Sequence, residues 1–146
     1  MKHRTGLLIL GLIVLLAAAC SKGGVPYDDS NDGGAYVYNA GDTTAPVLNI
    51  YTPVDNQVYT NGNAINVTGR ITDDAGLYRG KIRIINDATG SILKEQQYEI
   101  HGIATYNFNI SYTTAVTSPA DYTVTVSFED HGLNSATKSV KVKVNP

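Results

Sequence analysis

The chain has 146 residues, with 11 Lys and Arg against 13 Asp and Glu, which gives a formal net charge of −2. This balance, without a basic patch, argues against nucleic acid as a partner. The single cysteine excludes an internal disulfide, so the stability of the fold must come from its core.

The first predicted element is an apolar run over residues 7–19, which follows the basic residues Lys2, His3 and Arg4. As a helix this run spans roughly 20 Å, which is too short for the roughly 30 Å hydrocarbon core of a bilayer. A basic start, a short apolar run and small residues before a cleavage site predict a secretory signal peptide over residues 1–19.

The only cysteine, Cys20, directly follows three alanines. This stretch resembles the lipobox of bacterial lipoproteins, although the position three residues before the cysteine is Ala17 where leucine is favoured. The resemblance implies a diacylglyceryl group on the Cys20 thiol, cleavage before Cys20 and an acyl chain such as palmitate on the new amine. Ser21 resembles the pattern of lipoproteins that proceed to the outer membrane. The alternative is an ordinary signal peptide with a cysteine nearby by chance.

Residues 20–45 are predicted to be a flexible tether, because residues 21–45 hold five glycines, several aspartates and few aliphatic side chains. Such a chain has a root-mean-square reach of roughly 25–30 Å. One apolar cluster interrupts this segment, at Tyr36, Val37 and Tyr38. It is either a short strand that packs against the domain or part of a disordered chain. The globular part therefore begins after the tether and stands clear of the lipid surface.

From residue 46 to residue 146, short runs rich in Val, Ile, Tyr and Thr alternate apolar with polar positions. These runs are "PVLNIY", "AINVTGRI", "KIRII", "YNFNISY", "YTVTVSF" and "VKVKV". Period-two alternation between turn residues predicts half-buried strands, and about seven of them in this length predict an all-β fold, a single β-sandwich. Tyr122, at the start of the penultimate strand, resembles the tyrosine corner of immunoglobulin-type sandwiches, which implies an architectural role.

Three segments carry a wider resemblance: "DTTAPVLNIYTPVDN", "INVTGRITDDAGL" and "YTVTVSFEDHGLNSATKSVKV". They resemble the bacterial Ig-like domains of cell-surface proteins, including Ig-like lipoproteins, over residues 42–145. The likeness implies an immunoglobulin-like β-sandwich but no particular activity. In the last loop, Leu133 separates glycine from asparagine where the family has no extra residue.

The first candidate site is a group of carboxylates that the order of strands brings to the tether end of the sandwich. It consists of Asp42, Asp73, Asp74, Glu129 and Asp130. Carboxylate oxygens are the ligands that Ca²⁺ prefers, so a calcium site is one hypothesis. The alternative is that these aspartates cap turns through local backbone hydrogen bonds.

The sequence offers two other candidate binding surfaces. Exposed tyrosines stack on sugar rings, and the candidates are Tyr51, Tyr59, Tyr78, Tyr98 and Tyr112. Arg79, Lys81 and Arg83 form a basic ladder, which is either a solvated face, a guarded sheet edge or a site for an acidic polymer.

Catalysis finds no support in the sequence. His101 and His131 lie in no nucleophile or metal motif, and no Gly-x-Ser-x-Gly elbow or phosphate-binding loop is present. The sequence therefore predicts a non-enzymatic lipoprotein of the bacterial outer membrane, anchored by lipid and facing the periplasm or the surface. Its Ig-like domain is expected to be an interaction or structural module whose partner is an envelope protein or glycan. The alternative is a carbohydrate-binding accessory of a glycan uptake system.

Overall fold

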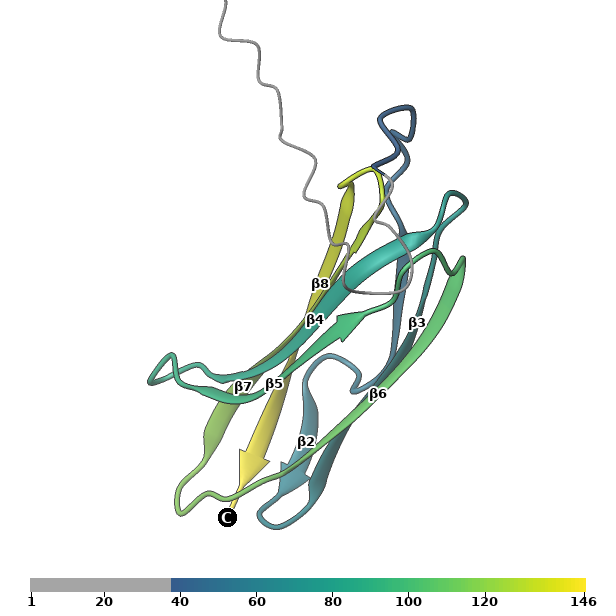
Figure 1. The fold of residues 1–146 in the computed structure, drawn as a ribbon. Coiled ribbons are helices and arrows are strands. Elements are labelled where there is room, and N and C mark those ends of the chain that lie inside the picture. Colours follow the sequence, from purple (N-terminus) through teal and green to yellow (C-terminus); the bar gives the residue numbers. More distant parts are fainter. Residues whose placement is uncertain (1–37) are drawn as a thin grey trace, which may run out of the picture.

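The computed structural model describes residues 38–146, which fold into eight strands and no helix (Figure 1). The predicted signal peptide and Cys20 lie outside the described residues. Within residues 38–146 no helix is long and apolar enough to cross a membrane. The strands are β1 (Val47–Thr52), β2 (Gln57–Thr60), β3 (Ala64–Thr72), β4 (Leu77–Asn86), β5 (Ile92–Glu99), β6 (Thr105–Thr113), β7 (Ala120–Asp130) and β8 (Ser135–Asn145).

The strands form two sheets that pack face to face. One sheet has three strands in the order β1-β3-β6, and the other has five in the order β2-β8-β7-β4-β5. All pairs are antiparallel except β2 with β8. The penultimate strand lies between the last strand and β4, as in immunoglobulin-type sandwiches. The predicted all-β, Ig-like sandwich is confirmed.

Two strands appear where the sequence predicted none. β2 lies within "TPVDNQVYTNGN", which was expected to be a turn, and it pairs in parallel with the C-terminal half of β8. β5 reads "ILKEQQYE" and shows no clean alternation, because it is an edge strand with mostly polar side chains. Both segments are strands because they pair with a neighbouring strand, and the local sequence pattern does not encode that pairing.

The core is built from the side chains that the alternation placed on one face. Buried residues alternate with exposed or half-buried ones along β3, β6 and β7, as the period of two requires. The fully buried set includes Ile65, Val67, Ile71, Leu77, Ile82, Ile84, Val124, Val126, Val142 and Val144.

Two phenylalanines at the centre of the core each lie over a glycine of the neighbouring strand. Phe108 pairs with Gly69, and Phe128 pairs with Gly80. A Cβ atom at Gly80 would lie 2.1 Å from Cδ1 of Phe128, so the ring occupies the space that a side chain would fill. The two rings belong to different sheets and stack with centroids 5.5 Å apart. The missing side chains therefore let the rings join the two layers.

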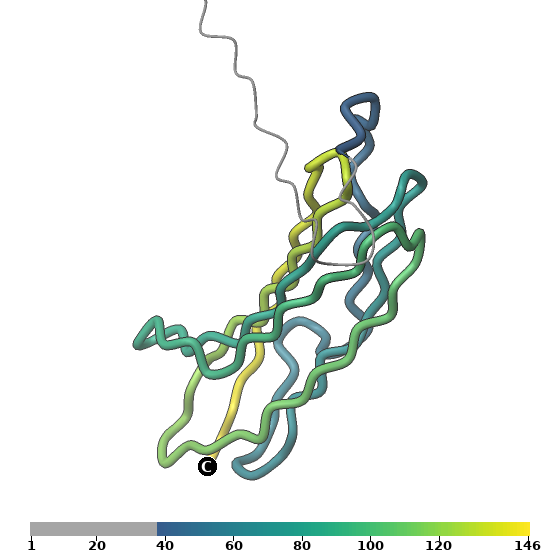
Figure 2. The backbone as a smooth tube through the Cα atoms, viewed as in Figure 1, coloured from purple at the N-terminus to yellow at the C-terminus, as the bar shows by residue number. Residues whose placement is uncertain are grey.

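The chain enters the sandwich at one end and leaves it at the other. Figure 1 shows the first described residues beside the β3–β4, β5–β6 and β7–β8 turns, with the C-terminus at the opposite end. In Figure 2 the β4–β5 hairpin projects sideways from the body. The end where the chain enters is called the entry pole below. Its turns are joined by backbone hydrogen bonds such as Asn39 N–H to His131 O at 3.1 Å.

Candidate metal centre

Three carboxylates converge at the entry pole. Asp42 comes from the segment that precedes β1, and Asp73 and Asp74 come from the β3–β4 turn. One oxygen from each lies within 4.8 Å of the others. Asp42 and Asp73 are half-buried, whereas Asp74 is exposed. This spacing suits a hard cation that takes oxygen ligands.

One oxygen of each half-buried carboxylate, Asp42 and Asp73, accepts hydrogen bonds that cap its own turn. Asp73 Oδ2 accepts hydrogen bonds from the N–H groups of Ala75 at 2.9 Å and Gly76 at 2.7 Å. Asp42 Oδ1 accepts one from the N–H of Thr44 at 3.0 Å. The capping role considered from the sequence is therefore present, and it occupies one oxygen of each side chain.

The second oxygen of each of these two carboxylates is buried and accepts no hydrogen bond. These atoms are Asp42 Oδ2 and Asp73 Oδ1. Burial raises the pKa of Asp73, the N–H groups of its turn lower it in part, and the charges of Asp130 and Asp42 raise it further. A buried, unsatisfied, negatively charged oxygen is costly unless a proton or a cation compensates it. Two uncompensated oxygens are therefore present beside the capped ones, and their chemistry fits a hard cation such as Ca²⁺.

The two remaining predicted ligands lie apart from this trio. Asp130 is fully buried, and it accepts hydrogen bonds from Asn134 through the backbone N–H at 2.9 Å and the side-chain Nδ2 at 3.1 Å. Glu129 points to the opposite face of β7, because neighbouring residues of a strand alternate faces. There it forms an ion pair with Arg79 at 3.1 Å. The charge of Asp130 thus acts on Asp73 of the trio, and Glu129 pairs with Arg79 instead.

Asp42 is held in place by the β7–β8 turn. Asn134 Nδ2 donates to the backbone oxygen of Asp42 at 3.1 Å. Gly132 packs so closely that a Cβ atom there would lie 2.7 Å from the same oxygen. A turn some ninety residues away in sequence therefore positions one of the three carboxylates, and no local motif could have revealed it.

The tyrosines do not form a flat platform in the described part of the chain. Of the five candidates only Tyr51 is largely exposed, at 56%. Tyr98 packs edge-on against Tyr106 at 5.6 Å, and Tyr112 packs against Tyr122 at 6.4 Å. Tyr122 itself is buried and starts the penultimate strand as expected; its tyrosine-corner hydrogen bond stays a prediction.

The two histidines of residues 38–146, far apart in the sequence, lie together at the entry pole. The rings of His101 and His131 are 5.7 Å apart, and each also contacts the ring of Tyr78, at 5.0 and 5.3 Å. No local pattern in the sequence predicts this cluster, because it depends on the β5–β6 and β7–β8 turns meeting.

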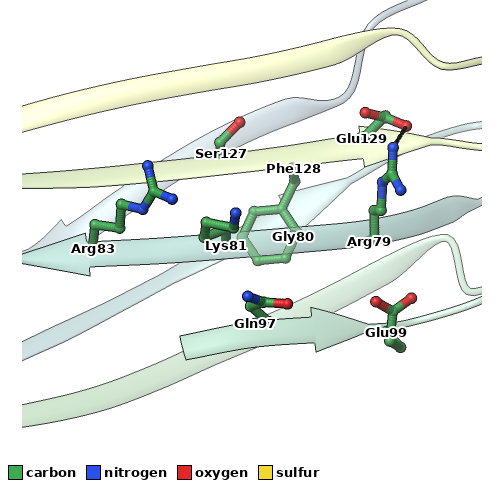
Figure 3. Close-up of a pocket in the computed structure, with 9 residues that line it drawn as sticks. All are labelled: Arg79, Gly80, Lys81, Arg83, Gln97, Glu99, Ser127, Phe128 and Glu129. Carbon is green, nitrogen blue, oxygen red and sulfur yellow. Dashed lines mark hydrogen bonds and ion pairs between the residues drawn. The ribbon is translucent and has the colours of Figure 1, made fainter. Parts of the chain in front are cut away.

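The basic ladder lies on the outer face of the five-stranded sheet, along the floor of a polar groove of about 460 Å³ (Figure 3). Because β4 lies between β5 and β7, the ladder is a solvated face and guards no edge. Arg79 pairs with Glu129, and Arg83 pairs with Glu95 at 2.6 Å. These acidic partners neutralise most of the positive charge that an acidic polymer would need.

No protein-family model matches this chain, and no curated protein matches its sequence. Among solved structures, the chain is similar to the fibronectin(III)-like modules of CbhA from Clostridium thermocellum, with a TM-score of 0.44 and 17% identity. That match covers 69% of this chain and 47% of the other, so this chain spans about half of its length. A CARDB domain from Pyrococcus furiosus, solved in complex with di-metal ions, is similar with a TM-score of 0.39 and 14% identity, over 70% of this chain and 93% of that one. The two sheets, their strand order and the core between them define the fold of this protein as an Ig-like sandwich.

Proposed function

We propose that this chain is a lipoprotein of the bacterial outer membrane whose Ig-like domain is a non-enzymatic binding module. Acyl chains on Cys20 anchor it, and residues 20–45 supply the spacer, whose last residues pack on the entry pole. The observation that supports this most is the position of the entry pole. The described chain joins the sandwich at one end and the C-terminus lies at the other, so the far pole stands opposite the point where the spacer arrives and is offered to an envelope protein.

The test is capture of the tagged full chain from crosslinked envelopes, with identification of bound proteins and glycans by mass spectrometry. The matched control is Cys20→Ala, which removes the acylated thiol and leaves the domain unchanged. We expect an envelope protein that is enriched with the wild-type chain and lost with the variant. Equal recovery from both chains would contradict a role for anchoring, and recovery of polysaccharide alone would instead favour the carbohydrate-binding alternative.

We also propose that Ca²⁺ binds the trio of Asp42, Asp73 and Asp74. Since Asp42 belongs to the entering segment and the other two belong to the β3–β4 turn, a shared ion would tie the spacer to the sandwich. The two buried oxygens that accept no hydrogen bond support this.

Thermal unfolding of the full chain in millimolar Ca²⁺ and then in chelator tests the calcium proposal. The midpoint is expected to rise with Ca²⁺ and to be unresponsive in Asp73→Asn. Asp55→Asn is a matched control, because Asp55 is an exposed aspartate that binds the backbone N–H of Lys141. Identical midpoints with Ca²⁺ and chelator would contradict the proposal.

A further inference from the structure

Strand β6 forms one edge of the three-stranded sheet, and its outward backbone groups can be assigned from the ladder that it shares with β3. At one end of this ladder Asp73 N–H donates to Ala104 O at 2.9 Å, and at the other Thr114 N–H donates to Asn63 O at 2.9 Å. Backbone groups of an antiparallel strand alternate between its two sides. The even-numbered residues of β6 therefore bond to β3, and the odd-numbered residues direct their N–H and C=O groups to the free side. The outward set is Thr105, Asn107, Asn109, Ser111 and Thr113.

The other three sheet edges carry features that discourage pairing with a second chain. β1 lies between Pro46 and Pro53 and has a register irregularity, and β2 has only 4 residues. On β5, Ile100 N–H donates to Tyr78 O, so the outward residues are the odd-numbered ones and include Glu95 and Glu99. Prolines, bulges, short strands and charges are the usual protections of an edge.

β6 has none of these protections. Its 9 residues, "TYNFNISYT", include no charge and no proline, and its ladder with β3 runs without a shift. The outward residues are all exposed, while Phe108 and Ile110 are buried beneath the strand. A long, regular and uncharged edge is a template for another strand.

We propose that β6 pairs with β6 of a second copy of this chain, antiparallel and centred on Asn109. A two-fold axis between two copies of one strand makes the pairing antiparallel, and centring it on Asn109, the middle residue of β6, lets all 9 residues overlap. Asn109 faces Asn109 of the second copy, Asn107 faces Ser111, and Thr105 faces Thr113. All five outward residues fall in hydrogen-bonded pairs, and the two three-stranded sheets become one continuous sheet.

Charge favours a second copy in this orientation. No like charges meet along the uncharged strand, whereas self-pairing of β5 in the same manner would bring its glutamates toward each other. β6 begins next to the carboxylates of the entry pole, since Thr105 and Asp73 line one shallow pocket. Antiparallel pairing places the two acidic poles at opposite ends of the dimer, where they do not repel each other. The 9 residues of β6 span roughly 30 Å. This length is close to the reach of the tether, so two copies anchored in one membrane can pair with their strands lying along its surface.

Hydrogen exchange of single amides, measured by NMR on the detergent-solubilised full chain, tests the pairing. At millimolar concentration the outward amides of β6 are expected to exchange at least about tenfold more slowly than at micromolar concentration, because paired amides exchange only when the pairing opens. The outward amides of Glu95, Gln97 and Glu99 on β5 are the internal control and should not change. Outward β6 amides that exchange as fast as those of β5 at millimolar concentration would overturn the proposal.

Two lysine substitutions test the register. Asn109→Lys places two like charges directly opposite each other across the axis, so protection of the β6 edge should be lost. Asn107→Lys places the same charge opposite Ser111 of the second copy and should keep most of the protection. Both positions are exposed, so the monomer keeps its fold. Equal protection in the two variants would overturn the centred register.

Discussion

Gly80→Ala tests the claim that the core depends on a ring lying over a glycine. The new Cβ would lie 2.1 and 2.2 Å from Cδ1 and Cε1 of Phe128. Carbon atoms at their optimal separation are about 3.5–4.0 Å apart, so the ring would have to move by more than an ångström. It has little room to do so, because Phe128 is 1% exposed and stacks on Phe108 at 5.5 Å.

The expected loss of stability follows from this geometry. Overpacking of a core costs about 1–3 kcal/mol, and the fixed register between Gly80 and Phe128 puts this case at the upper end, about 3 kcal/mol. In a Phe128→Ala background, which itself costs about 3–5 kcal/mol, the obstacle is gone. The second Gly80→Ala substitution should then be neutral or stabilise by about 0.4–1 kcal/mol, since alanine reduces the entropy of the unfolded chain.

Urea denaturation of the four chains in this double-mutant cycle measures the coupling between the two positions. Gly41→Ala is a matched control, because a Cβ there makes only an ordinary contact of 3.5 Å with Asn39. A coupling energy near 3 kcal/mol is expected from the overpacking cost. If Gly80→Ala costs the same with and without the Phe128 ring, or costs no more than Gly41→Ala, the reasoning is refuted.

Three further predictions concern polar groups and strain. The hydroxyl of Tyr98 is buried without a hydrogen-bond partner, and burial, followed by the effect of Tyr106, raises the pKa of Tyr98 to about 12. Tyr98→Phe should therefore stabilise the domain by about 1 kcal/mol in urea denaturation. The wild-type chain should lose stability relative to this variant as pH rises from 10.0 toward about 12, because Tyr98 ionises at a lower pH in the unfolded chain than in the folded one. Equal dependence of stability on alkaline pH in the two chains would contradict this. The pKa of Asp73 is raised, so metal-free stability should fall as pH rises above its ordinary value of 3.8, and the gain in melting temperature from Ca²⁺ should grow over the same range; a gain that is equal at acid and neutral pH would count against the site. Leu133 has a φ of 64°, where a side chain costs about 1–2 kcal/mol. Leu133→Gly should stabilise the domain by about 0.5–1 kcal/mol, since glycine adopts this conformation freely but loses more entropy on folding; unchanged stability in urea would show that the turn is not strained.

The sequence predicted those parts of the fold in which one face of a strand is buried. Along β7 the alternation of Tyr122, Val124, Val126 and Phe128 with polar residues determines both the strand and its orientation. It could not predict β5, whose polar residues are strand because β4 pairs with them. The role of the two glycines also depends on which strands become neighbours.

The candidate site shows the same division between local and long-range information. Counting strands brought Asp42 and Asp73 to the same pole, and the structure places them there with Asp74. The strand order alone also places Glu129 at this pole. Its side chain nevertheless lies away from the three carboxylates, because adjacent residues of a strand face opposite ways. The close contact between Gly132 and the backbone oxygen of Asp42 forms only when the β7–β8 turn packs on the entering segment.

The central claim, a binding domain displayed on a lipid anchor, is tested most directly by the mass of the mature N-terminus. The measurement is mass spectrometry of the N-terminal peptide of the full-length gene product, recovered from the envelope fraction of the cells that express it. We expect a chain that begins at Cys20 and carries a diacylglyceryl group and an N-linked acyl chain. A chain with an unmodified Cys20 thiol, or one recovered from the soluble fraction, would contradict it.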